Sequence, residues 1–194
     1  MTRIHLQVKI NRAAFKLDVN LQLPAQGISA IFGPSGSGKG TIASRLATLL
    51  GFTLLDSGAL YRVLGLAAQR AKLSPDADSE AIAELASSLD IRFGRPSIDV
   101  PWSEGSVWLG NEDVSLAIRN DEASAMASQV AAIPAVRTAL LQRQRDFLGA
   151  NGLVADGRDM GTTVFPNAAV KIFLTASVEA RAERRYKQLI GKGI

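Results

Sequence analysis

The sequence predicts an α/β fold in which helices cover both faces of a mostly parallel sheet, a three-layer sandwich. Short apolar runs alternate with segments of helical periodicity along most of the chain. A glycine-rich loop joins one of these runs to the helix that follows it, and two later runs end in an aspartate, Asp56 and Asp156. Ligands of such folds bind at the carboxyl ends of the strands, so the loop and both aspartates are expected at one edge of the sheet.

The glycine-rich loop lies between the apolar run Ile28–Phe32 and a helix with apolar residues at Ile42, Leu46 and Leu49. Glycines let successive backbone N–H groups turn toward a phosphate, the helix N-terminus adds partial positive charge, and Lys39 can reach the β- and γ-phosphates. The pattern therefore predicts a P-loop NTPase-type fold with a nucleoside triphosphate site. The expected ATP-binding residues are Gly33, Pro34, Ser35, Gly36, Ser37, Gly38, Lys39, Gly40 and Thr41.

One position in this loop narrows the class of protein. The common motif has Ser or Thr directly after the lysine, where its hydroxyl holds Mg²⁺. Here Gly40 follows Lys39, and Thr41 comes next. The string Gly-Lys-Gly-Thr resembles the loop of nucleoside monophosphate kinases.

The first 27 residues predict an antiparallel β-hairpin. Apolar and polar residues alternate strictly over Ile4–Ile10 and again over Phe15–Leu23, with a polar break between them. Residues 1–38 resemble the front of an ABC-type transport ATPase, especially the molybdate-importer kind. An ABC-type ATPase is disfavoured for the whole chain, because the Leu-Ser-Gly-Gly-Gln signature is missing and His5 is the only histidine.

Further elements follow the phosphate loop in alternation. Buried strands are expected over Phe52–Asp56, Gly152–Asp156 and Val170–Leu174, and short strand signals between Leu89 and Val114 predict a small β insert. Expected helices are one that Ser57 caps, Ala81–Ser88, Asn120–Ala132, Ala135–Phe147 and a basic helix opened by Ser177.

Composition excludes several classes of function. The 194 residues contain no cysteine and no apolar run approaching the ~18 residues of a membrane span, which favours a cytoplasmic protein without a membrane partner. The net charge is +4, yet no block of Lys and Arg is interleaved with aromatic residues. A phosphorylated small molecule therefore explains the basic excess better than a nucleic acid does.

From about residue 33 onward, six ordered segments are similar to bacterial cytidylate kinases. They are the phosphate loop, Leu55–Arg62, Glu112–Arg119, Ala127–Arg137, Gln144-Arg145 and Ala155–Thr162. The resemblance implies transfer of the ATP γ-phosphoryl group to CMP or dCMP with Mg²⁺. It also implies a kinase-like domain over residues 28–194, with an NMP-binding insert at about 72–132.

The resemblance implies a role for each matching residue in CMP binding. Asp159 would accept from the cytosine N4 amine, which uracil lacks, and Arg137 and Ser128 would donate to the acceptor side. Arg62 and Arg158 would clamp the CMP phosphate, and Tyr61 would lie against the ribose. The full expected set is Ser35, Ser57, Tyr61, Arg62, Ser128, Arg137, Arg158 and Asp159.

Catalysis of phosphoryl transfer depends on positioning and on cations more than on a base. The expected catalytic residues are Lys39, Arg158, Arg184 and Arg185, although the last two are equally compatible with a solvated helix face. Asp156 resembles the carboxylate that holds Mg²⁺ through water. Asp56 is the second candidate, and the sequence does not decide between them.

Two departures from the family pattern predict a fusion. The hairpin replaces the single short strand expected before the loop, and the chain ends at Ile194, inside the lid of the family. We expect a chimera that lacks the C-terminal half of the lid and the last strand, with impaired kinase activity. The alternative is a non-catalytic nucleotide-binding scaffold of the same fold. The open sheet edge predicts pairing with the hairpin or with a second copy as a homodimer.

Overall fold

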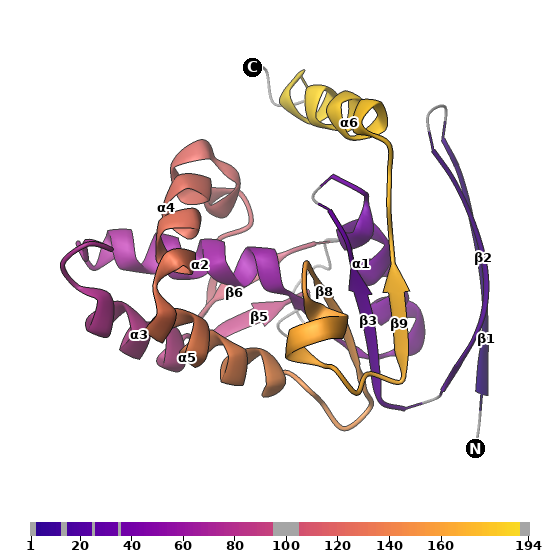
Figure 1. The fold of residues 1–194 in the computed structure, drawn as a ribbon, viewed down its shortest axis with the longest axis horizontal. Coiled ribbons are helices and arrows are strands. Elements are labelled where there is room, and N and C mark those ends of the chain that lie inside the picture. Colours follow the sequence, from indigo (N-terminus) through magenta and orange to yellow (C-terminus); the bar gives the residue numbers. More distant parts are fainter. Residues whose placement is uncertain (1–2, 13–14, 25, 35, 95–104, 191–194) are drawn as a thin grey trace.

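The structure is a computed structural model that describes residues 3–12, 15–24, 26–34, 36–94 and 105–190. Its centre is a four-stranded parallel sheet in the order β4-β8-β3-β9, and Figure 1 shows helices on both sides of it. The strands are β3 (Ile28–Phe32), β4 (Thr53–Asp56), β8 (Leu153–Gly157) and β9 (Val170–Phe173). The predicted three-layer α/β fold with four parallel strands is confirmed.

The register of the sheet brings the expected ligand groups to one edge. Asp56 on β4 pairs with Asp156 on β8, and Gly157 pairs with Phe32, the last residue of β3. The phosphate loop leaves β3 directly after Phe32. Three neighbouring strands therefore end at the same level, with two carboxylates and the glycine-rich loop side by side, as the sequence predicts.

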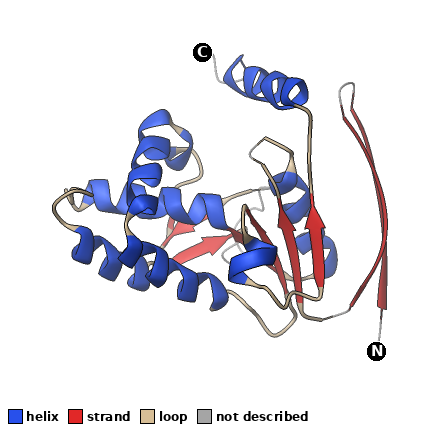
Figure 2. Ribbon diagram, in the orientation of Figure 1, coloured by secondary structure: helices blue, strands red, loops and turns tan. Residues whose placement is uncertain are grey.

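The core has two parts, one on each face of the sheet. Helix α1 (Lys39–Leu50) packs on the face that carries Ile31 and Val154. The opposite face, with Leu55 and Leu153, is covered by a larger group of helices, which lies on the other side of the sheet from α1 (Figure 2). That group comprises α2 (Ser57–Arg70), α3 (Ser79–Ser88), α4 (Asp121–Ala132) and α5 (Pro134–Arg145).

The apolar face of α1 differs from the one predicted. Ala43, Leu46 and Ala47 are buried, but Leu49 is 68 % exposed. The small alanines let the helix lie close to the strands, so the helix face that contacts the sheet is rotated away from Leu49. An exposed leucine of this kind needs no functional reason, since folded proteins expose many apolar atoms.

The expected β insert is present as a separate antiparallel sheet. It consists of β5 (Ile91–Phe93), β6 (Val107–Leu109) and β7 (Glu112–Asp113), followed by the 3₁₀ turn η1 (Ala117–Arg119). Arg70 at the end of α2 donates two hydrogen bonds of 2.7 Å to the Glu112 carboxylate. This forked ion pair ties the insert to the main body.

Three local features differ from the sequence prediction. The cap of α2 is Asp56 and not Ser57, because the Asp56 Oδ1 atom accepts from the Ala59 N–H at 2.9 Å while Ser57 is already helical. Pro134 is the first residue of α5, where its missing N–H costs nothing. The segment η2 (Met160–Val164) forms a π-helical turn that no sequence pattern indicated.

The predicted N-terminal hairpin is confirmed as β1 (Arg3–Arg12) and β2 (Phe15–Pro24), paired in antiparallel register over ten positions. His5 hydrogen-bonds Asn20 across the two strands. Figure 1 shows the hairpin beyond β9, and among the described residues it touches other elements only sparsely. The last helix is α6 (Val178–Ile190), and Ser177 Oγ accepts from the Ala180 N–H in its first turn. Within the described segments, no helix has the length and apolar character needed to cross a membrane.

Candidate nucleotide-binding site

At the start of the phosphate loop, the backbone of Gly33 passes close to the backbone of Leu174. Gly33 has φ +145°, and a Cβ there would lie 2.2 Å from the Leu174 carbonyl oxygen. Only glycine fits this contact, because a carbonyl oxygen on the backbone cannot swing aside. The loop ends at Gly38, which is left-handed and precedes the first turn of α1. Within the loop, the Ser37 hydroxyl is completely buried and has no hydrogen-bond partner among the described residues.

Lys39 and Asp156 form the charged centre of the site. The Lys39 Nζ atom lies 3.8 Å from Asp156 Oδ1, an ion pair too long for a hydrogen bond. Asp156 is only 5 % exposed, and its Oδ1 atom has no hydrogen-bond partner in the described part of the chain. Burial and the neighbouring Asp56 raise the pKa of Asp156 to about 7, although Lys39 opposes the rise. The buried group therefore keeps its proton more readily than an ordinary carboxyl does, and a cation bound beside it would favour the charged form.

Gly40 has a spatial reason to be glycine. A Cβ at this position would lie 3.2 Å from Asp156 Oδ2, closer than side chains usually approach. A serine or threonine here would crowd the carboxylate on the neighbouring strand. The unusual position of Thr41, one residue later than in the common motif, therefore goes together with a carboxylate that approaches the first turn of α1.

The structure distinguishes the two aspartates that the sequence left equivalent. Asp56 Oδ1 is occupied as the cap of α2, where it accepts from the Ala59 N–H. Among the described residues, Asp156 caps no helix, and its buried Oδ1 atom has no hydrogen-bond donor. Among the described residues there is no group of three His, Cys, Asp or Glu side chains that could hold a metal without help. A divalent ion at Asp156 would complete its shell with water and nucleotide phosphates, as Mg²⁺ commonly does.

The expected base-recognition residues come together from three different elements. Tyr61 on α2 is half-buried, and burial is the main reason that its pKa is raised. Asp159, which follows β8, raises that pKa further, and Arg137 in the first turn of α5 lowers it. Both charges therefore act on the same phenol, so Asp159 and Arg137 each lie near Tyr61.

The other expected CMP residues that the structure describes lie on neighbouring helices or directly after β8. Arg62 follows Tyr61 on α2, and Arg158 is exposed just beyond β8. Ser57 is buried in the first turn of α2. Ser128 on α4 donates its hydroxyl proton to the Ser124 carbonyl at 3.0 Å, so this hydroxyl must rotate before it can donate to a base.

For three predicted site residues, the structure describes either nothing or only the backbone. Ser35 is outside the described residues, and the structure shows only the backbone of Arg184 and Arg185, on α6. The same helix brings an unexpected residue to the phosphate loop. A Cβ on Gly36 would lie 3.4 Å from the Arg181 Cβ, and the buried Arg181 Nε atom has no partner in the described segments. The sequence signal that could have predicted a role for Arg181 is its spacing from Arg184 and Arg185, which puts the three arginines on one helix face.

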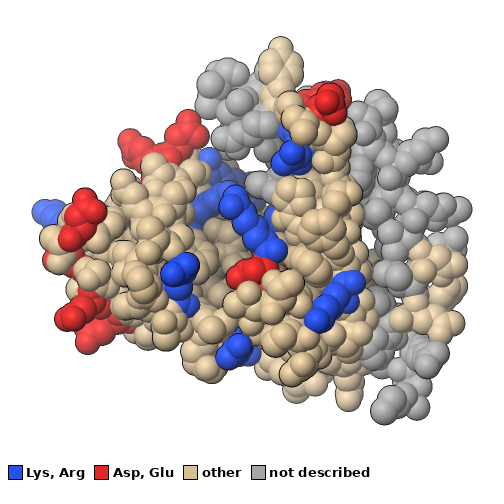
Figure 3. Space-filling view, viewed as in Figure 1, with Lys and Arg blue, Asp and Glu red and all other residues tan. Residues whose placement is uncertain are grey.

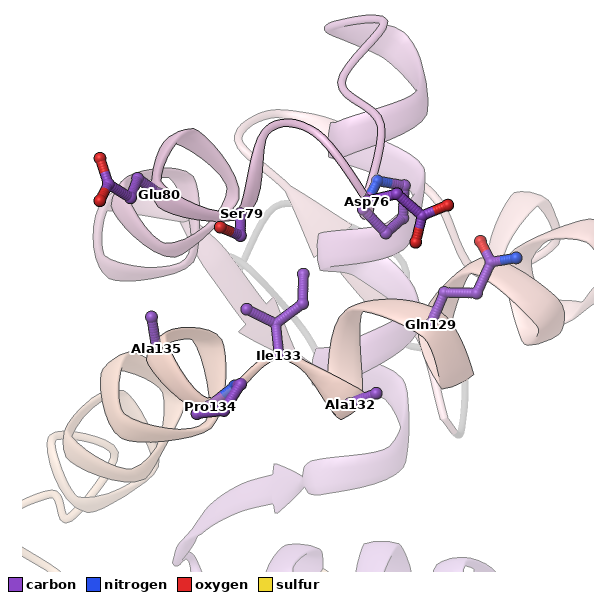
Figure 4. A pocket seen from close by; sticks show the side chains of 9 residues that line it. Asp76, Ser79, Glu80, Gln129, Ala132, Ile133, Pro134 and Ala135 are labelled. Atoms are coloured by element: carbon purple, nitrogen blue, oxygen red, sulfur yellow. The ribbon is translucent and has the colours of Figure 1, made fainter.

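The charge distribution marks the same region of the surface. Figure 3 shows Lys and Arg side chains gathered around a hollow between the helical part and the sheet, with acidic side chains beside them. A different groove, of about 710 Å³, lies between the start of α3 and the junction of α4 with α5 (Figure 4). Its described lining residues, Asp76, Glu80 and Ile133 among them, include none of the predicted site residues. This groove is therefore separate from the nucleotide site.

The fold and the site together define the class of protein. A glycine-rich loop between a parallel strand and a helix, with its lysine facing a buried carboxylate on the next strand, is the arrangement of P-loop nucleotide-binding proteins. The nucleoside monophosphate kinase fold is the member of this class that the parallel sheet and the small β insert fit.

Comparison with known proteins narrows the class to one family. The family model described as cytidylate kinase matches residues 29–194. The chain is 55 % identical to a cytidylate kinase of Ralstonia pickettii over 166 residues, which is 86 % of this chain and 68 % of the relative. A cytidylate kinase of Pasteurella multocida is 56 % identical over 167 residues, 86 % of this chain and 71 % of the relative. The chain belongs to the cytidylate kinase family. The likeness of residues 1–38 to a transporter ATPase stays a prediction.

Proposed function

We propose that this chain transfers the γ-phosphoryl group of ATP to CMP or dCMP. The observation that supports the proposal is that Asp159 and Arg137, from two different elements, both act on the pKa of Tyr61, so both charges lie near the same phenol. A carboxylate and a guanidinium at one place can accept from the cytosine amine and donate to its N3 and O2 atoms. Uracil presents a carbonyl where cytosine has the amine, so the Asp159 carboxylate would face an acceptor.

The phosphates are proposed to lie between the loop and the surrounding arginines. ATP binds through the loop residues 33–41, where the N–H groups and Lys39 offset the charge of the β- and γ-phosphates. Arg62 and Arg158 hold the CMP phosphate, and Tyr61 lies against its ribose. Arg184 and Arg185 supply further positive charge to the transferred group. Ser35, Ser57 and Ser128 complete the proposed contacts.

We also propose that ATP binds with Mg²⁺ and that Asp156 holds the ion through water. The buried Oδ1 atom, which has no donor within the described part of the chain, fits a cation or its water ligands, whereas Asp56 already caps a helix. A bound Mg²⁺ would neutralise phosphate charge during transfer. Without the ion, Lys39 is the cation that opposes the raised pKa of Asp156.

Calorimetry and a coupled kinase assay on the same sample test the proposed function. We expect ATP and CMP to bind and UMP to bind about five- to 150-fold more weakly, because one unpaired polar group costs about 1–3 kcal/mol. ADP release should require CMP. Binding of CMP without ADP release would favour the non-catalytic scaffold, and equal binding of CMP and UMP would refute the base assignment. The expected impairment of this 194-residue chain stays a prediction that the measured turnover decides.

We further infer that residues 1–27 form a unit separate from the kinase-like domain at 28–194. The family match begins at residue 29, and the described hairpin has only sparse contacts with the rest of the chain. An origin from an ABC-type ATPase, and hence a chimera, is our interpretation of its alternation. Deleting residues 1–27 should leave ATP and CMP affinity unchanged, and a large loss of either would contradict the division.

An open edge of the sheet leads us to propose self-association. Strand β9 ends the order of the sheet, and among the described strands its only partner is β3. Phe173 on this strand is 61 % exposed. Unpaired edges favour pairing with a further strand, so a homodimer through β9 is expected. We propose a cytoplasmic location, which the lack of cysteine is compatible with. Sedimentation of a monomer at high concentration would contradict the dimer.

A further inference from the structure

Asp159, the residue expected to recognise the cytosine amine, begins a backbone turn of unusual form. The Asp159 carbonyl accepts from the amides of Thr162, Thr163 and Val164, at 3.2, 2.9 and 3.3 Å. The turn continues as η2, where the Phe165 N–H donates to the Met160 carbonyl at 2.9 Å. Hydrogen bonds to the fifth residue define a π-helix, a form that is rare and concentrated at functional sites.

Close packing fixes the body of this turn. Met160 is completely buried, and a Cβ on Gly161 would lie 2.7 Å from the Phe32 ring at the end of β3. The turn is therefore pressed against the strand that leads into the phosphate loop. Its start is continuous with β8 through Gly157, so the position of the Asp159 backbone follows from the sheet on one side and from the turn on the other.

The far end of the turn is held by an arginine of α5. The Arg145 Nε atom donates to the Val164 carbonyl at 3.1 Å, and this bond is partly buried. Arg145 is the last residue of α5, and Arg137 lies in the first turn of the same helix. The two arginines are eight positions apart on the α-helix, a rise of about 12 Å. One helix thus carries the expected base donor at its start and the anchor of the Asp159 turn at its end.

We propose that Arg145 is a positioning residue that sets the spacing between Arg137 and Asp159, and thereby the preference for cytosine over uracil. The inference rests on the proposed function. Arg145 acts through the Val164 carbonyl and the π-turn. A base edge requires donor and acceptor at a fixed separation, and the hydrogen bond at Val164 joins the two elements that supply them. Without this bond, α5 and the turn can shift apart while the phosphate loop stays in place.

The chain offers a matched control on the same helix. The Arg143 Nη2 atom also donates to a backbone carbonyl, that of Leu89, at 2.9 Å, and its guanidinium lies 5.2 Å from the centre of the Phe147 ring. This bond ties α5 to the segment before the β insert, away from the π-turn. Arg143→Ala therefore removes a comparable anchor of α5 without touching η2.

Titration of the full chain with CMP, UMP and ATP tests the proposal. We expect Arg145→Ala to lose about tenfold of the preference for CMP over UMP, the order of one hydrogen bond, while ATP affinity changes less than twofold. In steady-state assays, the KM for CMP should rise more than kcat falls. Arg145→Lys keeps one donor and should recover part of the preference. Arg143→Ala should keep the preference of the unmodified chain, even if its melting temperature falls.

The outcomes separate this inference from the function on which it rests. An unmodified chain that does not discriminate CMP from UMP refutes the proposed function and the positioning role together. An unmodified chain that prefers CMP, with Arg145→Ala equally selective, refutes the positioning role alone. Equal losses of selectivity in Arg145→Ala and Arg143→Ala, or equal losses of CMP and ATP affinity, would reduce Arg145 to a general stabiliser and also refute it.

Discussion

The proposed site has two halves. The buried half consists of Lys39 on α1 and Asp156 on β8, and the exposed half consists of Tyr61 on α2, Arg137 on α5 and Asp159 before the π-turn. On the phosphate side, Asp156 is 5 % exposed and interacts with Lys39 at 3.8 Å. On the base side, Arg137 and Asp159 are both exposed. Charges in the buried half act in a low dielectric and each has a large effect. In the exposed half, we propose that recognition depends on the spacing of the groups, which the hydrogen bond from Arg145 to Val164 would maintain.

Among the substitutions considered, we expect the largest loss of activity from one at Lys39, in the buried half of the site. Lys39→Met removes the cation beside the transferred phosphates, and we expect kcat to fall by about a thousandfold, the scale typical of lost electrostatic stabilisation of a transition state. A coupled assay at saturating ATP and CMP measures it. Lys72→Met, at an exposed lysine between α2 and α3, is the control and should keep full activity. A loss below tenfold for Lys39→Met would show that the two halves of the cleft do not differ as described.

Asp156 makes the stability of the free protein depend on pH. Its pKa is about 7 in the fold against an ordinary 3.8, so between these values the folded state holds a proton that the unfolded state has lost. Stability therefore falls as pH rises through this window and levels off above about 7. Asp156→Asn lacks this decline, and relative to the unmodified chain it should gain about 3 kcal/mol between pH 4.5 and pH 8.

Urea unfolding of both proteins at the two pH values checks this prediction. Any constant cost of leaving Lys39 without its partner cancels in the comparison between pH values. The same experiment on Asp146→Asn, at an exposed carboxylate after α5, should show no pH-dependent gain. Identical pH profiles for Asp156→Asn and the unmodified chain would mean that the Asp156 carboxylate is solvated, against the picture of a buried charge.

A smaller effect, on stability, is expected at Gly161, where the π-turn packs against Phe32 at the end of β3. Gly161→Ala forces a methyl group to within 2.7 Å of the Phe32 ring, and we expect a loss of about 1–3 kcal/mol in unfolding free energy, as is usual for overpacking. Urea unfolding measures it. Gly58→Ala, in the first turn of α2, meets only an ordinary contact of 3.4 Å and is the matched control. Equal stability of the two variants would contradict the tight packing of the π-turn.

Features set by local pattern could be predicted from the sequence. The loop from Gly33 to Thr41, the parallel strands that carry Asp56 and Asp156, and the N-terminal hairpin all follow from short apolar runs, glycines and alternation. These signals span few residues and need no knowledge of the tertiary contacts. Asp159 and Arg137 were found through the family resemblance, because neither stands out from the residues around it.

Features set by distant contacts could not be predicted in this way. The π-turn depends on Phe32 and on Arg145, which lies 19 residues from its acceptor Val164. The assignment of the α2 cap to Asp56 instead of Ser57 depends on where helical geometry begins, and both residue types are good caps. The exposure of Leu49 reflects how closely the alanines of α1 approach the sheet. In each case the local sequence allows more than one conformation, cap residue or buried face, and tertiary packing decides which of them forms.

The central claim is that a carboxylate at 159 reads the amine of cytosine, and the affinity ratio for CMP over UMP in Asp159→Asn tests it most directly. The carboxamide can present either its oxygen or its NH₂ group, so it accommodates both bases. We expect the preference for CMP to fall by about two orders of magnitude while ATP affinity holds. A preference for CMP that survives Asp159→Asn undiminished would contradict the account.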